Sequence, residues 1–341
     1  VTGVIALAGS LLTIPAVWGL QKKIRDSALK YYTKTGTGGR GSISRLIRTI
    51  DSGQSVKRNK DGSVDYDGLR NTIDFNIAAG SKTILLTVGD SHYICLSEEE
   101  IAEITRVTVE HTARRAMVVA ADRYLDTQRS VAFAEFAKET KADVLMVLPP
   151  NWGYSITVET VSDHYGAVSQ VMPVMIVTGL FIGQGPEFAL SAIARALDSH
   201  PSIVAVKDDM CGDFARRLCL LAHEHVAVFA GGQKVNHINM WPYGCDGYMS
   251  TYMGLKPQIA LDYWNAVEAT DLVKMRAIVE KYDMPFFDFI LKCTGGWNAG
   301  LHGSLEVFGV AKRWRRPPYY SLNDEEMEEL SSFFDGLGLL S

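Results

Sequence analysis

The sequence predicts an α/β protein, a (β/α)8 TIM barrel with a C-terminal helical extension. From residue 80 to residue 270, short apolar runs rich in β-branched residues alternate with longer helical patterns, which is the order of βαβ units. The runs are apolar throughout rather than at every second position, as expected of strands that are covered on both faces. Eight such strands, each followed by a helix, fit a closed barrel better than an open doubly wound sheet.

Composition excludes several classes of protein. The chain has 341 residues, of which 47% are hydrophobic and 21% are charged, and its net charge is −5. These are ordinary globular values, so a disordered chain, a collagen-like repeat and a nucleic-acid protein built on positive charge are disfavoured. Five cysteines without a Cys-x-x-Cys pair indicate neither a disulfide framework nor a zinc ribbon, so we expect a reducing, cytoplasmic location.

The first expected strand is Leu12–Val17, which lies in an uncharged N-terminal segment, Val1–Gln21. This segment is long enough for a signal or a membrane anchor. Its glycines, Pro15 and the lack of preceding basic residues favour a buried strand instead, so no membrane partner is expected. The other expected strands are the later apolar runs, Lys82–Val88, Ala116–Ala121, Asp143–Leu148, Pro173–Thr178, Ile203–Lys207, Val226–Ala230 and Gly247–Ser250.

Amphipathic stretches lie between these strands. Ser97–Arg115 opens with Ser97-Glu-Glu-Glu100, a capping-box pattern that places acidic residues at the positive end of a helix dipole. Similar helices are expected at Thr127–Thr140, Val158–Val171, Pro186–Ser199 and Asp213–His223. We therefore predict a barrel over residues 1–255 and a helical region over residues 256–341, with helices near Lys256–Thr270, Leu272–Tyr282, Pro285–Lys292 and Asp324–Phe334.

A basic stretch at about residues 20–60 follows the first expected strand. It has eleven lysines and arginines against Asp26 and Asp51, in a protein whose net charge is negative. We interpret it as an insertion in the barrel, either a solvated excursion that packs on the barrel or on a neighbouring subunit, or an anion-binding lid or partner surface. Gly36-Thr-Gly-Gly-Arg-Gly41 has the spacing of a dinucleotide fingerprint, but no buried strand precedes it, so we expect a loop there.

Active sites of (β/α)8 barrels lie at the C-terminal ends of the strands. Lys207 ends the apolar run Ser202–Lys207, where partial desolvation would lower the pKa of its amine and let it attack a carbonyl to form a Schiff base. The alternative is a lysine that only pairs with Asp208 or Asp209. The turn Thr87-Val88-Gly89 is either a binding site for a small carboxylate, through a hydroxyl and backbone N–H groups, or a plain turn.

Short motifs along nearly the whole chain point to a known family. They are Asp61-Gly-Ser-Val-Asp-Tyr-Asp-Gly-Leu69, Ala78-Ala-Gly80, Thr87-Val-Gly-Asp-Ser91, Leu96-Ser-Glu-Glu-Glu100, Ser202-Ile-Val-Ala-Val-Lys207, Gly231-Gly232, Gly247-Tyr-Met-Ser250 and Arg315-Arg-Pro-Pro318. Together they resemble the dihydrodipicolinate synthase and N-acetylneuraminate lyase family. The resemblance implies an enzyme that forms a Schiff base between a lysine and pyruvate or another 2-oxo acid, usually as a homotetramer.

The resemblance also implies roles for single residues. Lys207 would form the Schiff base, and Thr87 with the amides of Val88 and Gly89 would bind the pyruvyl carboxylate. Gly232 and Met249 would line the pocket through their carbonyls, and Gln233, Lys234 and His237 would follow where family members vary their substrate contacts. The covalent imine needs no cofactor and no metal. The expected partners are a small-molecule 2-oxo acid and further copies of the chain, without nucleic acid.

The chain departs from the family pattern at the proton shuttle. The family's turn reads Gly-Thr-Thr-Gly-Glu, and its second threonine relays protons to a tyrosine. Here Val88 has no hydroxyl, and Val177 or Thr178 stands at the tyrosine's place. A replacement would be needed, because a positioned acid or base contributes about 10²–10⁴-fold. The candidates near the barrel mouth are His92, Tyr93, Asn151, Tyr154, Thr178 and Asp208.

Two functions follow from these observations. The first is a Schiff-base lyase, an aldolase or dehydratase, that acts on pyruvate or another 2-oxo acid through Lys207 with an atypical proton shuttle. The second is a catalytically inactive barrel that binds a ligand or regulates a partner, which the missing hydroxyl groups motivate. Dihydrodipicolinate synthase activity itself is not expected, because the distal arginine of those enzymes has no counterpart near Phe181–Gly185.

Overall fold

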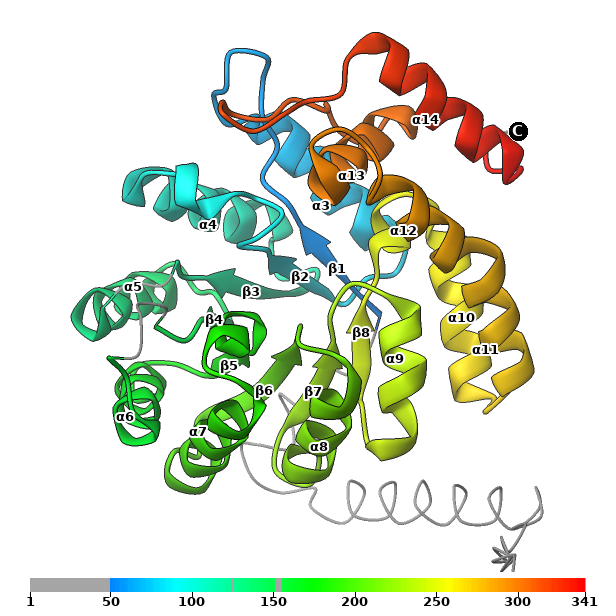
Figure 1. The fold of residues 1–341 in the computed structure, drawn as a ribbon. Coiled ribbons are helices and arrows are strands. Elements are labelled where there is room, and N and C mark those ends of the chain that lie inside the picture. Colours follow the sequence, from blue (N-terminus) through cyan, green and yellow to red (C-terminus); the bar gives the residue numbers. More distant parts are fainter. Residues whose placement is uncertain (1–49, 124–125, 151–154, 341) are drawn as a thin grey trace, which may run out of the picture.

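The computed structural model describes residues 50–123, 126–150 and 155–340. Within these ranges, eight parallel strands follow one another around a closed sheet (Figure 1). The last strand pairs with the first through Tyr248 with Ile50 and Met249 with Asp51. The strands are β1 (Ile50–Gln54), β2 (Thr83–Leu86), β3 (Met117–Ala121), β4 (Val144–Val147), β5 (Val174–Val177), β6 (Ile203–Asp208), β7 (Ala227–Ala230) and β8 (Gly247–Met249).

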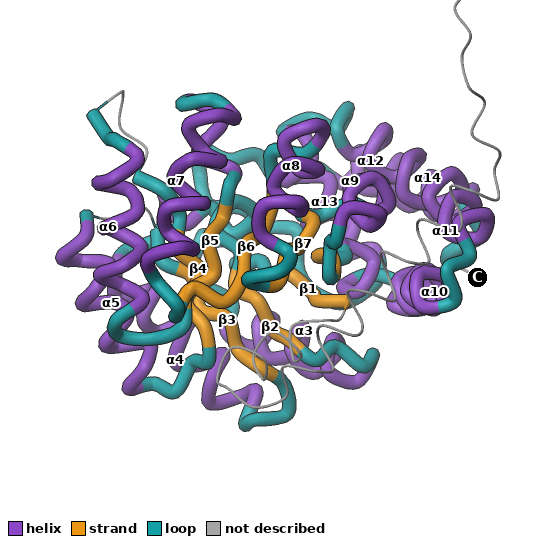
Figure 2. The backbone as a smooth tube through the Cα atoms, turned by 90° about the horizontal axis from the view of Figure 1, so that it is seen from below, coloured by secondary structure: helices purple, strands orange, loops and turns teal. Residues whose placement is uncertain are grey.

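Helices surround the strands on the outside (Figure 2). Those that follow the strands are α3 (Tyr66–Ala78), α4 (Glu98–Thr112), α5 (Thr127–Glu139), α6 (Val158–Ser169), α7 (Pro186–Ser199), α8 (Gly212–Ala222) and α9 (Lys234–Met240). The C-terminal region consists of α10 (Pro257–Glu268), α11 (Leu272–Ile278), α12 (Met284–Ile290), α13 (Gly296–Val307) and α14 (Asp324–Gly336).

Strand residues alternate between two apolar clusters. In β5, Val174 and Ile176 belong to the cluster that contains the core-facing residues of helices α5–α10. Met175 and Val177 belong to a second cluster, which joins alternate residues of β3, β4, β5 and β7. Because successive side chains of a strand point to opposite faces, the second set lies on the inner face of the curled sheet. Both faces are therefore apolar, which explains the continuous apolar runs in the sequence.

A bulge in β6 determines which of its side chains face inward. Val174 of β5 pairs with Ile203, but the next residue, Met175, pairs with Ala205, so Val204 is the extra residue. Beyond the bulge Lys207 pairs with Val177 of β5 and with Phe229 of β7. Both partners belong to the inner cluster. Register partners share a face, so the side chain of Lys207 points to the inside of the sheet.

The structure confirms the α/β class, the C-terminal helices and the later strands. The ends of strands β2–β8 lie within two residues of the ends of the predicted runs. The first strand is corrected: the strand that pairs with β2 and β8 is Ile50–Gln54, whereas the predicted strand Leu12–Val17 lies outside the described residues. β1 thus falls inside the stretch that we interpreted as a basic insertion, whose residues 20–49 are likewise outside the described ranges.

Two basic residues of that stretch are buried rather than solvated. Lys57 and Arg58 are 1% and 0% exposed. Lys57 Nζ donates to Ser55 Oγ at 2.9 Å, and Arg58 Nη2 donates to the carbonyl of Ser91 at 3.2 Å. Burial, and then the positive charge of Arg315, lowers the pKa of Lys57 to about 7. The segment after β1 is therefore fixed to the turn after β2 instead of forming a surface excursion.

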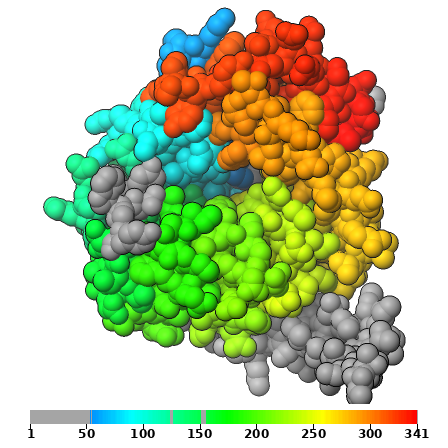
Figure 3. All heavy atoms as spheres, in the orientation of Figure 1, coloured from blue at the N-terminus to red at the C-terminus, as the bar shows by residue number. Residues whose placement is uncertain are grey.

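The C-terminal region packs beside the first helices of the barrel. In Figure 3 its orange and red residues lie against the cyan residues of α4. Arg316 joins the two regions, because its Nη2 donates to Glu100 Oε1 of α4 at 2.6 Å. Lys312 Nζ lies 3.1 Å from Asp65 Oδ2 at the start of α3. No helix in the described ranges has the length and apolarity needed to cross a membrane.

Candidate functional site

Lys207 lies at the C-terminal end of β6 and forms an ion pair with the second residue after it. Its Nζ donates to Oδ1 and Oδ2 of Asp209 at 2.5 Å and 2.6 Å. The side chain of Lys207 is 13% exposed and that of Asp209 is 33% exposed. The strand end therefore presents a largely enclosed amine in direct contact with a carboxylate that solvent can still reach.

Neighbouring strands hold Asp209 in place. Its backbone N–H donates to Thr178 Oγ1 at 2.9 Å, and this hydroxyl donates to Asp208 Oδ1 at 2.9 Å. A β-carbon at Gly231, after β7, would overlap Asp209 Oδ1 and lie 2.8 Å from the carbonyl oxygen of Asp208. Only glycine at this position leaves the carboxylate of Asp209 beside Lys207. Thr178, one of the predicted acid/base candidates, uses its buried hydroxyl to position the neighbouring strand end.

Asp90, in the turn after β2, lies within electrostatic range of the same ion pair. Burial raises the pKa of its carboxyl to about 6, while the charge of Lys207 lowers it and that of Asp209 raises it. In the same turn, Thr87 Oγ1 lies 3.3 Å from Ser91 Oγ, and Val88 packs against the inner apolar cluster. Sequence reasoning placed Asp90 in the motif but did not include it, or Asp209, among the acid/base candidates.

Side chains of the C-terminal region donate hydrogen bonds to the backbone of this turn. The backbone carbonyl of Asp90 accepts hydrogen bonds from Asn298 Nδ2 at 3.1 Å, His302 Nε2 at 3.2 Å and Arg315 Nη1 at 3.2 Å. The buried guanidinium of Arg315 also donates from Nη2 to the carbonyl of Val56 at 3.1 Å. Helix α13 and the segment after it therefore fix the backbone of the turn that contains Asp90.

The other predicted binding residues lie at neighbouring strand ends. Gly232 follows β7 with a φ of 56°, which favours glycine, and its carbonyl accepts a hydrogen bond from Thr251 Oγ1 at 3.1 Å. Gln233 is partly exposed and directly precedes α9. Met249 ends β8 and is buried in the inner apolar cluster. These positions surround the end of the sheet that holds Lys207, as expected for one mouth of a barrel.

The predicted acid/base candidates differ in what the structure gives them. His92 stacks on Tyr319 with ring centroids 3.7 Å apart. Burial, followed by the charges of Arg315 and Arg58, lowers the pKa of His92 to about 4, so the ring is neutral at pH 7. Tyr93 is fully buried, which raises the pKa of its hydroxyl. Tyr154 and Asn151 lie outside the described residues.

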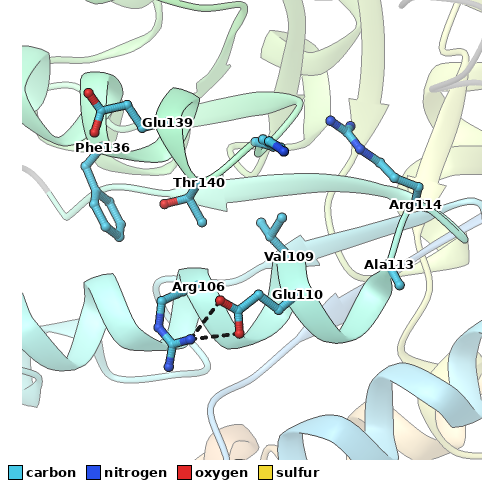
Figure 4. Close-up of a pocket in the computed structure, with 9 residues that line it drawn as sticks. Arg106, Val109, Glu110, Ala113, Arg114, Phe136, Glu139 and Thr140 are labelled. Carbon is cyan, nitrogen blue, oxygen red and sulfur yellow. Dashed lines mark hydrogen bonds and ion pairs between the residues drawn. The ribbon is translucent and has the colours of Figure 1, made fainter.

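In the part of the chain that the structure describes, no three His, Cys, Asp or Glu side chains are grouped as metal ligands. A hollow with a volume of about 580 Å³ lies between the C-terminal ends of α4 and α5. The ion pair of Arg106 and Glu110 is part of its lining (Figure 4). These helix ends precede β3 and β4, so the hollow lies at the opposite end of the sheet from Lys207.

Asp122, directly after β3, predicts a pH dependence of stability. Ser130 Oγ donates to its Oδ2 at 2.5 Å, and burial raises the pKa of this carboxyl from 3.8 to about 7. The folded state then binds more protons than the unfolded state, so the stabilisation is present below pH 4 and is lost as the pH rises to 7. Relative to wild type, Asp122→Asn should therefore gain roughly 2–4 kcal/mol of unfolding free energy between pH 4 and pH 8.

Urea denaturation at both pH values measures this difference. The matched control is Asp163→Asn, an exposed carboxylate on α6, whose stability relative to wild type should not change with pH. If Asp122→Asn kept the same stability difference from wild type at both pH values, folding would not raise the pKa of Asp122.

Comparison with known proteins gives one consistent family. The model of the dihydrodipicolinate synthetase family matches residues 51–335. The 4-hydroxy-tetrahydrodipicolinate synthase of Leptothrix cholodnii is 29% identical over 223 residues, which cover 64% of this chain and 74% of that protein.

Solved structures show the same fold. The N-acetylneuraminate lyase of Fusobacterium nucleatum has a TM-score of 0.75 and 18% identity, over 86% of this chain and 99% of that one. YagE of E. coli K12, a protein of the dihydrodipicolinic acid synthase family in complex with pyruvate, has a TM-score of 0.74 and 20% identity, over 86% and 99%. Because the family match extends over most of the chain, this protein belongs to the dihydrodipicolinate synthetase family.

Proposed function

We propose that the protein is a Schiff-base lyase, an aldolase or dehydratase, that acts on pyruvate or another small 2-oxo acid through Lys207. The observation that carries the proposal is the enclosed amine of Lys207 on the inner face of the sheet, at the C-terminal end of β6. Membership of a lyase family supports this reaction class. Pyruvate in the complex of a protein with the same fold supports the substrate class.

The chemistry needs only groups of the chain. The lone pair of a neutral Lys207 amine attacks the 2-oxo carbon, and loss of water gives an imine that accepts electrons from a bond to be broken next to it. No cofactor or metal is required for this step. We also propose that the chain assembles as a homo-oligomer, as the family resemblance implies.

The turn after β2 is the proposed binding site for the substrate carboxylate. Thr87 contributes its hydroxyl, and Val88 and Gly89 contribute their backbone N–H groups. Gly53 of β1 leaves room for this turn, because a β-carbon there would lie 2.8 Å from Thr87 Cγ2. A carboxylate at this turn would face the positive charge of Lys207 across the mouth of the barrel.

The carbonyls of Gly232 and Met249 are the proposed polar lining on the opposite side, and Gln233 is a proposed contact to the variable part of the substrate. All three follow or end strands at the mouth, beside β6 and β1 in the strand order. The identity of the substrate beyond its 2-oxo acid group would depend on these residues.

An inactive ligand-binding barrel is the second candidate function. The observation that favours it is the absence of a free hydroxyl where a proton relay is expected, since Val88 has none and the hydroxyl of Thr178 donates to Asp208. Such a protein could form the imine at Lys207 but would not move protons on the bound substrate.

Borohydride trapping tests the proposal. The protein is incubated with pyruvate, and in parallel with sugar-derived 2-oxo acids, then reduced and mapped by peptide mass spectrometry. We expect one adduct, on Lys207. No adduct with any 2-oxo acid, or adducts spread over exposed lysines such as Lys138, would refute it. Exchange of the pyruvate methyl protons in D2O, followed by NMR, separates the two functions, because only an enzyme that forms an enamine from the imine exchanges them.

A further inference from the structure

We propose that Asp209 is a catalytic residue that accepts the proton Lys207 must lose and returns it to the hydroxyl that leaves as water. This inference rests on the proposed Schiff-base function and names its missing proton carrier. Asp209 contacts the reacting atom itself, since both carboxylate oxygens accept hydrogen bonds from Lys207 Nζ at 2.5 Å and 2.6 Å. The longer distance is at the short end of the range of about 2.6–3.2 Å required of a general base, and the other is just below it.

The two adjacent carboxylates are held in different ways. Asp208 is fully buried, and its carboxylate accepts hydrogen bonds from the Thr178 hydroxyl and from the backbone N–H groups of Met210 and Cys211. It therefore shapes the strand end. Asp209 has a side chain that is 33% exposed and points its carboxylate at Lys207. Of the two, only Asp209 is placed both to contact the amine and to be reached by a ligand.

Several elements fix Asp209 in this position. Thr178, after β5, binds its backbone N–H, and Gly231, after β7, leaves the space that its carboxylate occupies. A β-carbon at Gly179 would lie 3.3 Å from the β-carbon of Asp209. A carboxylate confined on both sides needs little reorganisation before proton transfer, which is the arrangement that preorganised catalytic groups require.

The substrate itself would promote the transfer. The titratable groups within electrostatic range of Asp209 are Lys207 and Asp208 on β6, Asp90 on the turn after β2, and Cys211 before α8. A bound 2-oxo acid adds a further negative charge and excludes water. Transfer of the proton leaves both groups neutral, so it costs less where water, which solvates the two charges, is excluded.

The step is balanced in atoms and charge. Asp209 takes one proton from the Lys207 ammonium, and the nitrogen lone pair forms a bond to the 2-oxo carbon while the carbonyl π electrons move to oxygen. A second proton moves from nitrogen to that oxygen and gives the carbinolamine. Asp209 then donates its proton as the C–O bond breaks, so water leaves and a protonated imine forms. The carboxylate of Asp209 is regenerated, and the reverse sequence releases product.

The rate of borohydride-trapped adduct formation with pyruvate, measured from pH 5 to pH 9, tests this role. Asp209→Asn should form the adduct about 10²–10⁴-fold more slowly than wild type, which is the usual contribution of a positioned acid or base. Its rate should also lose the wild-type pH dependence. Asp209→Glu should recover part of the rate, and added acetate should accelerate Asp209→Gly, which a residue that only orients Lys207 would not show.

The matched control is Asp213→Asn. Asp213 is an exposed carboxylate at the start of α8 that pairs with Arg217 at 2.7 Å, and its loss should leave the rate unchanged. If wild type forms the adduct and Asp209→Asn forms it equally fast with the same pH profile, this inference is wrong and the proposed function stands. If wild type forms no adduct with any 2-oxo acid, both are wrong.

Discussion

Replacement of Lys207 by arginine should abolish the borohydride-trapped adduct and lower the rate of pyruvate proton exchange by about 10⁴-fold or more, as loss of a covalent nucleophile does. A guanidinium stays protonated at every accessible pH and cannot become the imine nitrogen. It keeps the positive charge beside Asp209, which Lys207 contacts at 2.5 Å. The free energy of unfolding should therefore change by less than about 1 kcal/mol.

Intact mass spectrometry after reduction, together with urea denaturation, separates loss of chemistry from loss of fold. Lys138→Arg, at an exposed lysine of α5, is the matched control and should keep the full adduct and the full exchange rate. Persistent proton exchange in Lys207→Arg would mean that another group carries the reaction, and the assignment of Lys207 would then be wrong.

Replacement of Asp283 by asparagine should destabilise the protein by about 3–5 kcal/mol, the cost of leaving one member of a buried ion pair without its partner. Lys234 Nζ of α9 donates to Asp283 Oδ1 at 2.9 Å, and the two side chains are 1% and 2% exposed. The Asp283 carboxylate also accepts the backbone N–H of Val235 at 3.3 Å. This pair connects α9 to the residues between α11 and α12.

The destabilisation should decrease as the pH rises. Burial lowers the pKa of Lys234, and Asp283 opposes that shift, so the folded pKa of Lys234 falls further once the carboxylate is removed. The folded state then binds fewer protons than the unfolded state, and its stability rises with pH. Urea denaturation of Asp283→Asn at pH 7 and pH 9.5 measures this trend.

Two comparisons make the result specific. Asp288→Asn, at an exposed carboxylate of α12, should have little effect on stability. The double variant Lys234→Met with Asp283→Leu should recover most of the loss, because an apolar pair needs no counter-ion. A double variant as unstable as Asp283→Asn alone would show that packing, and not the unpaired charge, determines the cost.

Strand prediction succeeded where burial on both faces left a continuous apolar signal, as in Val144–Val147 and Val174–Val177. It failed at β1, because Ile-Asp-Ser-Gly-Gln lacks that signal and lies in a basic stretch. Helix α13 was not predicted from the sequence, because three of its residues, Gly296, Gly300 and Gly303, are poor helix formers. Their small size serves packing: a β-carbon at Gly300 would lie 2.7 Å from Ile290 Cβ.

The candidate site was only partly visible in the sequence. The position of Lys207 at the end of an apolar run gave a clear signal. The environment of Asp209 depends on Thr178 and Gly231, which follow two other strands, and nothing in the local pattern around Asp209 predicts that they meet there. The charge pattern alone also suggested that Lys57 and Arg58 are solvated. In the structure both are buried, and they donate hydrogen bonds to the hydroxyl of Ser55 and to the carbonyl of Ser91.

The anchoring of the Asp90 carbonyl has a consequence for synthesis of the protein. Asn298, His302 and Arg315 are 208, 212 and 225 residues away from Asp90 in the chain. During translation Lys207 and all the strands leave the ribosome well before these donors do. Contacts between such distant residues form slowly, because a long loop must close first. A nascent chain can thus complete its sheet early, but the turn after β2 reaches its final shape only when residues up to Arg315 have emerged.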